Sequence, residues 1–139
     1  MSMDSILFIL IGLFIISFNA KAEERILIKS IEPPISESLE VGQDYEIKIK
    51  AKYIRSKETG KVGLNIQRAE ADYPPLCVIR KNVQGESGMI DLSCKITVVN
   101  TPSITVFVPY YGEEGKSTST VDGRVYETVD NRNGKCFNK

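Results

Sequence analysis

The chain has 139 residues, of which 42% are hydrophobic and 26% are charged, a composition typical of one folded domain rather than of a disordered chain. Its basic and acidic residues number 18 each and cancel to a formal net charge of zero. We therefore expect no nucleic-acid partner, because such partners usually meet a basic surface. The sequence contains no histidine, which excludes histidine-based general-base catalysis and histidine-containing zinc sites.

An apolar run near the N-terminus, residues 6–18, predicts an export signal. Ala20 and Ala22 follow it with the small-x-small spacing of a signal cleavage site. A helix over this run would rise only about 20 Å, short of the ~30 Å hydrocarbon core of a membrane. The alternative is an uncleaved N-terminal membrane anchor, since Asp4 stands where export signals usually carry positive residues.

An export signal at this position divides the chain into three expected segments. We expect residues 1–22 to be a signal peptide, residues 23–130 a single β-sandwich domain, and residues 131–139 a polar C-terminal tail. The protein is then secreted or periplasmic. It meets a membrane only during export, unless the signal stays uncleaved.

Alternation of apolar and polar residues dominates the chain after residue 22 and predicts β-strands. In residues 45–53 every odd position is apolar or aromatic and every even position is charged, so one face should be buried and the other exposed. Residues 89–98 alternate in the same way. In chain order, we expect strands at residues 26–31, 45–53, 62–67, 76–83, 89–98, 104–110 and 124–129, with a short edge strand at 117–121.

Turn-forming residues separate these runs, among them Pro33-Pro34, Gly42, Pro74-Pro75, Gly85 and Asp122-Gly123. The sequence therefore predicts an all-β, antiparallel two-sheet sandwich of about seven to eight strands. A jelly roll or a small open barrel is the alternative.

Over residues 26–130 the chain resembles the immunoglobulin and fibronectin type III superfamily. The resemblance rests on the number of strands, the tyrosine-bearing strand 45–53 and the apolar strand 104–108. The resemblance implies an architecture and no site residue, because the chain has no tryptophan to match the hallmark position of such domains.

Three cysteines allow three disulfide pairings, and geometry favours Cys77–Cys94. If residues 84–87 form the loop of a hairpin, Cys77 lies directly opposite Cys94, within reach of a disulfide. Such a bond persists outside the cytoplasm and would stabilise the fold by about 3 kcal/mol. Two buried free thiols are the alternative. Cys136, in the polar tail, is then left to form an intermolecular disulfide and a homodimer, to pair with another cysteine, or to stay free.

The acidic residues do not form a recognisable catalytic arrangement, and we expect no catalytic residue, no cofactor and no metal ion. The candidate acids all fall in turn-like segments, where solvated side chains are the usual outcome; they are Glu70, Asp72, Glu113, Glu114, Asp122 and Asp130. Glu113, Glu114 and Asp122 gathered around a calcium ion would be the exception. Lys48, Lys50 and Lys52 form a positive stripe on one predicted strand, which either protects the sheet against aggregation or contacts an anionic partner.

Two aromatic segments are candidates for a protein interface. Phe107, Pro109 and Tyr111 make the second face of strand 104–110 apolar as well. They lie either on a central strand covered on both sides, which we favour, or in an exposed patch.

Tyr73, Pro74 and Pro75 form the other candidate. They are either a rigid exposed loop that docks a partner or only the corner between two strands.

The function that these features favour is an exported, noncatalytic module that binds another protein or a cell-surface component. One alternative is a structural subunit that assembles by strand addition or through Cys136. A carboxylate-dependent hydrolase is the remaining alternative.

Overall fold

The structure is a computed structural model of the whole chain, and it describes residues 24–55, 59–112 and 117–132. The expected signal peptide and Cys136 lie outside these residues, so export and a homodimer through Cys136 stay predictions. In the described part of the chain, no helix has the length and hydrophobicity needed to cross a membrane.

The described residues form eight strands. They are β1 (Arg25–Glu32), β2 (Leu39–Glu40), β3 (Asp44–Ile54), β4 (Thr59–Arg68), β5 (Cys77–Gln84), β6 (Ser87–Thr97), β7 (Ser103–Tyr111) and β8 (Ser117–Val129). Every predicted strand is present. The structure differs from the prediction in two ways. It contains β2, which was not predicted, and the segments expected at 117–121 and 124–129 form one continuous strand, β8.

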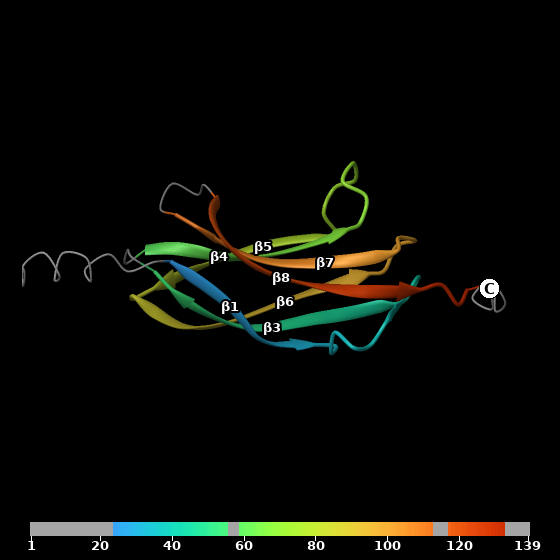
Figure 1. Cartoon of the computed structure of the whole chain (residues 1–139), viewed down its shortest axis with the longest axis horizontal. Coiled ribbons are helices and arrows are strands. Elements are labelled where there is room, and N and C mark those ends of the chain that lie inside the picture. The colour runs from blue at the N-terminus through green and yellow to red at the C-terminus, as the bar shows by residue number, and fades with distance from the viewer. Residues whose placement is uncertain (1–23, 56–58, 113–116, 133–139) are drawn as a thin grey trace, which may run out of the picture.

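The strands form two sheets, as predicted. One has the order β1-β3-β6 and the other the order β2-β8-β7-β4-β5. Figure 1 shows β4, β5 and β7 in one layer and β1, β3 and β6 in the other. All strand pairs are antiparallel except β2 with β8, which run parallel. The prediction of a wholly antiparallel fold is wrong at this pair, because β2 is too short to have given a sequence signal.

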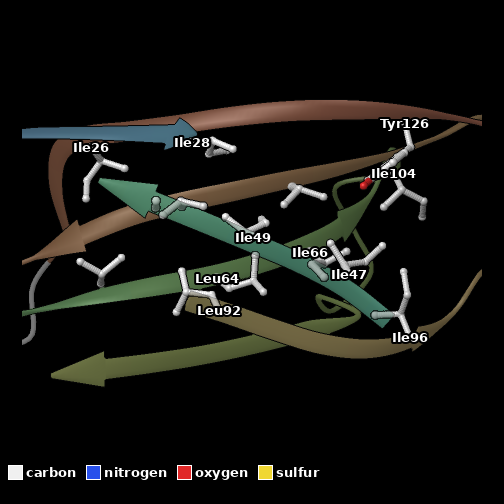
Figure 2. Close-up of a cluster of buried hydrophobic side chains, with 14 of the residues drawn as sticks. Ile26, Ile28, Ile47, Ile49, Leu64, Ile66, Leu92, Ile96, Ile104 and Tyr126 are labelled. Atoms are coloured by element: carbon white, nitrogen blue, oxygen red, sulfur yellow. The ribbon is translucent and has the colours of Figure 1, made fainter. Parts of the chain in front are cut away.

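The core lies between the two sheets, where the alternating apolar residues meet. Ile47 and Ile49 of β3 are at most 2% exposed, and so is Leu92 of β6. Figure 2 shows these side chains in one cluster with Leu64 and Ile66 of β4, in the opposite sheet. Each such side chain stabilises the fold by about 1.5–3 kcal/mol through burial, which is why the period of two in the sequence decides the fold.

The predicted Cys77–Cys94 disulfide is present, with the two Cα atoms 6.7 Å apart, but the hairpin expected around it is wrong. β5 pairs with β4, and β6 pairs with β3, so consecutive strands enter different sheets. The disulfide therefore joins the edge strands of the two sheets. On the same side of the sandwich, the Lys81 ammonium donates a hydrogen bond of 2.9 Å to the Asp91 carbonyl.

On the opposite side of the sandwich, β1 meets β8. The pairing of β1 with β3 is irregular between Ile28 and Ser30. The Ile28 amide donates a hydrogen bond of 2.8 Å to Asp122 Oδ2 of β8. Asp122 also accepts bonds of 2.9 Å from the Gly123 amide and from Arg124.

Asp122 and Gly123 were predicted to form a turn, but they lie in the middle of β8. The Asp122 side chain accepts its hydrogen bond from the backbone of β1, and β8 continues through this position without a turn. Burial alone would raise the pKa of this carboxyl, but hydrogen bonds from Ile28, Gly123 and Arg124 outweigh it and lower the pKa below the usual value.

Candidate interaction site

Phe107, Pro109 and Tyr111 lie on β7, between β4 and β8 in the five-stranded sheet. Pro109 and Tyr111 are buried and Phe107 is partly buried. These residues therefore lie on a covered strand and do not form an exposed aromatic patch.

The cover comes from neighbouring strands of the same sheet. The Arg80 guanidinium of β5 lies 4.0 Å from the centre of the Tyr111 ring, a cation–π distance. A Cβ atom on Gly63 would come within 2.8 Å of the same ring. Phe107 lies directly opposite Gly123 of β8. Because these glycines have no side chain, the aromatic rings can lie close to the backbone of the adjacent strands.

Three valines remain about half exposed near these rings: Val78, Val121 and Val125. Val125 and Val121 pair with Thr105 and Pro109 of β7. The outer face of the five-stranded sheet thus mixes these valines with exposed charged side chains, among them Arg80 and Lys61.

Tyr73, Pro74 and Pro75 lie in the loop between β4 and β5, residues 69–76, which we call the Tyr73 loop. Residues 71–75 are all exposed, and Tyr73 is 54% exposed. Figure 1 shows the loop, in lime green, projecting away from the two sheets. Each proline fixes its own backbone torsion and restricts the residue before it to extended conformations. The exposed segment is therefore stiff.

Arg68, the last residue of β4, holds the base of the Tyr73 loop. Its guanidinium lies 3.9 Å from the centre of the Tyr73 ring. Its Nε donates a bond of 2.8 Å to Glu70 Oε1, and its Nη2 donates one of 3.1 Å to the Asn100 carbonyl. One side chain thus fixes the aromatic ring, the start of the loop and the neighbouring loop between β6 and β7.

Thr101 completes this support. It is 4% exposed. Its hydroxyl donates a bond of 2.9 Å to Glu70 Oε1, and Thr101 Oγ1 accepts a bond of 3.1 Å from the Ala69 amide. The hydrogen bond from Arg68 is the largest cause that lowers the pKa of Glu70, and the bond from Thr101 is the next largest. The sequence left open whether Tyr73 lies in an exposed loop or only at a corner between strands, and it did not point to Arg68 or Thr101. Only the spacing of Arg68 and Glu70 around the loop could have suggested an ion pair.

Three acidic residues in the described part of the chain form close ion pairs with arginine. Glu70, Asp122 and Asp130 each lie within 2.9 Å of a nearby arginine. Among the described residues, no group of three or more His, Cys, Asp or Glu side chains is placed to hold a metal ion. The expected calcium cluster includes Glu113 and Glu114, which lie outside these residues.

Comparison with known proteins adds little. No family model and no curated protein sequence matches the chain. Among solved structures, the chain is similar to β-glucosidase from Listeria innocua bound to isofagomine, with 16% identity and a TM-score of 0.46. For the same enzyme bound to gluconolactone the values are 17% and 0.45. Each match covers 76% of this chain but only 16% of the enzyme, and a likeness this slight supports no inference about family or activity.

Proposed function

We propose that this protein is an exported, noncatalytic module with an immunoglobulin-like sandwich fold, and that it binds another protein through the Tyr73 loop. The fold assignment rests on two sheets of three and five strands whose connections repeatedly cross from one sheet to the other. Sandwiches of the immunoglobulin type have two such sheets in about 100 residues.

Export is supported by two features that are far apart in the chain. The apolar run at residues 6–18 with Ala20 and Ala22 has the pattern of a secretory signal. The Cys77–Cys94 disulfide is the kind of bond that forms and persists in oxidising compartments outside the cytoplasm.

Binding through the Tyr73 loop is supported by one observation, the exposure of a stiff aromatic segment on a fixed base. Tyr73 contacts Arg68 on one side of its ring and remains 54% exposed. Tyrosine is enriched among the residues that dominate binding energy at protein interfaces. Because two prolines and Arg68 already hold the segment, binding would cost little conformational entropy. The partner should offer an apolar pocket for the Tyr73 ring.

Site-specific photocross-linking tests this proposal. We would place a photoreactive amino acid at position 73 of the full chain, and at position 52 as a control, because Lys52 is exposed on the other sheet. The expected result is one cross-linked protein adduct from position 73 and none from position 52. Equal adducts from both positions, or none from position 73, would contradict the proposal.

The cross-linked partner then allows a direct affinity measurement. Tyr73→Ala should weaken binding about thirtyfold, the effect of losing about 2 kcal/mol at an interface hot spot. Tyr73→Phe keeps the ring and should bind within about threefold of the unmodified chain. Both variants should melt at the same temperature as the unmodified chain, since an exposed side chain is altered.

A further inference from the structure

A shallow groove of about 450 Å³ lies on the outer face of the three-stranded sheet. Two adjacent rows of paired residues cross β1, β3 and β6 there. Ser30, Lys50 and Asp91 form one row, and Glu32, Lys48 and Ser93 form the next. The groove thus presents ammonium groups at its centre and hydroxyl and carboxylate groups on both flanks.

The ammonium groups belong to the stripe of Lys48, Lys50 and Lys52 along β3. These residues alternate with the buried residues of the strand, so their Cα atoms are spaced about 7 Å apart. Of this stripe, Lys48 and Lys50 line the groove, and Lys81 of β5 adds a third ammonium group at its rim. An evenly spaced row of cations matches a linear polymer that carries a negative charge on successive units.

The ion pairs of these lysines are weak enough for a ligand to replace them. Lys48 lies 3.9 Å from Glu46, and Lys50 lies 3.9 Å from Asp91. The two lysine side chains are 59% and 55% exposed. Exposed pairs of this kind contribute about 0–1 kcal/mol, so an anionic ligand loses little by displacing the carboxylates.

The flanks of the groove distinguish one kind of polyanion from another. Ser30 and Ser93 supply hydroxyl groups, and Glu32 and Asp91 supply hydrogen-bond acceptors. Such groups can bind the hydroxyl groups of a sugar polymer, whereas the phosphodiester backbone of DNA has no hydroxyl group to donate to the two carboxylates. None of the residues that line the groove is aromatic, so the groove has no platform on which nucleobases could stack.

We propose that this groove binds an acidic polysaccharide, a linear sugar polymer with carboxylate or sulfate groups. Its anionic groups pair with Lys48 and Lys50, and its hydroxyl groups bind Ser30, Ser93 and the flanking carboxylates. The groove lies on a different sheet from the Tyr73 loop, so this activity is independent of protein binding by that loop, and either can fail without the other.

Calorimetric titration of the full chain tests the proposal, with a heparin oligosaccharide as the acidic probe and dextran as the neutral one. Heparin should bind at 50 mM salt, and its affinity should fall as salt rises to 200 mM, because binding releases counterions. Dextran should not bind. Double-stranded DNA should bind at least tenfold more weakly than heparin. Dextran binding as strong as heparin binding would overturn the proposal, and so would DNA binding as tight as heparin.

Matched lysine variants locate the site. Lys50→Gln should weaken heparin binding about fivefold, and Lys48→Gln/Lys50→Gln at least tenfold. Lys61→Gln is the control, because Lys61 is an exposed strand lysine on the other sheet, and it should leave the affinity unchanged. Ser93→Ala, which changes no charge, should weaken binding about twofold to threefold. Equal losses from Lys50→Gln and Lys61→Gln would overturn the assignment to the groove, and an unchanged affinity for Ser93→Ala would overturn the role of sugar hydroxyls.

Discussion

On one side of the sandwich, the edge strands β5 and β6 are joined by the covalent Cys77–Cys94 bond, whereas on the other side β1 and β8 meet through hydrogen bonds to Asp122. We call these the disulfide side and the Asp122 side. A disulfide stabilises a fold mainly by restricting the unfolded chain. The Asp122 side stabilises only the folded state, because it satisfies a backbone amide of β1 there. The two sides should therefore respond differently to reductant, mutation and pH.

The largest expected effect comes from opening the disulfide side. Cys77→Ser/Cys94→Ser should lower the free energy of unfolding by about 3 kcal/mol, the value expected for a loop of this length. The melting temperature should fall by about 10–15 °C, as measured by scanning calorimetry. The unmodified chain in reductant is the control and should melt at the temperature of the double variant. A melting temperature that reductant leaves unchanged would contradict the importance of this bond.

Asp122→Ala should have the next largest effect. It removes the acceptor of the Ile28 amide, and an unsatisfied backbone group costs about 1–3 kcal/mol. Urea unfolding should show a loss of about 2 kcal/mol. Asp91→Ala serves as the control, because the Asp91 side chain is 81% exposed, and it should cost less than about 0.5 kcal/mol. If Asp122→Ala and Asp91→Ala lower the free energy of unfolding by the same amount, β1 is not held to β8 by Asp122.

The pH dependence of the free energy of unfolding should distinguish the Asp122 side from the disulfide side. The pKa of Asp122 is lowered in the folded protein, so the fold favours its ionised form. The contribution of the Asp122 carboxylate to the free energy of unfolding is therefore fully present above the pKa of the unfolded chain, about 3.9. This contribution is lost as the pH falls through the lower pKa of the folded protein. The stability difference between the unmodified chain and Asp122→Ala should shrink from pH 6 to pH 2.

The disulfide side should show no such trend. The stability difference between the unmodified chain and Cys77→Ser/Cys94→Ser should stay constant over the same pH range, because the bond does not titrate. Chemical unfolding at a series of pH values measures both differences. Parallel curves for the two variants would mean that the Asp122 contribution does not come from its ionised carboxylate.

The smallest effect should come from Lys81→Ala. The variant removes the bond from the Lys81 ammonium to the Asp91 carbonyl, which is exposed to solvent. Since such a bond is partly replaced by water, the free energy of unfolding should fall by only about 0.5 kcal/mol. Urea unfolding tests this value. A loss above about 1.5 kcal/mol would mean that the disulfide side depends on more than its covalent bond.

Periodicity predicted the parts of the fold that bury one face. β3 alternates without interruption, so Ile47 and Ile49 could be assigned to the core and Lys48 and Lys50 to solvent. β2 could not be predicted, because Leu39–Glu40 is too short to show a period and is fixed by tertiary pairing with β8.

Local turn chemistry misled the interpretation of β8. Asp and Gly in succession favour turns, but the Asp122 carboxylate binds the Ile28 amide 94 residues away. This long-range bond allows the strand to continue. The support of the Tyr73 loop has the same character, since Thr101 lies 31 residues from Glu70. A single sequence shows which side chains can form hydrogen bonds, but it does not show which distant partners meet them.

The Cys77 pairing was predicted correctly from an incorrect arrangement of strands. The hairpin hypothesis required β5 and β6 to lie side by side in one sheet, but they occupy the edges of two sheets on the same side. The turn after Gln84 keeps the strands close in either arrangement. Proximity along the chain was therefore sufficient to identify the pair, although the sheet assignment depended on contacts with β3 and β4.

The disulfide also has a mechanical consequence. A force that pulls the two ends of the domain apart passes through the sulfur–sulfur bond, so the segment between Cys77 and Cys94 bears no load. The two cysteines are separated by 17 positions in the chain, which corresponds to a hidden extended length of about 60 Å at up to 3.6 Å per residue. The oxidised domain should therefore stretch to a shorter final length than the reduced domain. The closed loop from Cys77 to Cys94, which includes the Gln84–Ser87 turn, should stay unextended within the stretched chain.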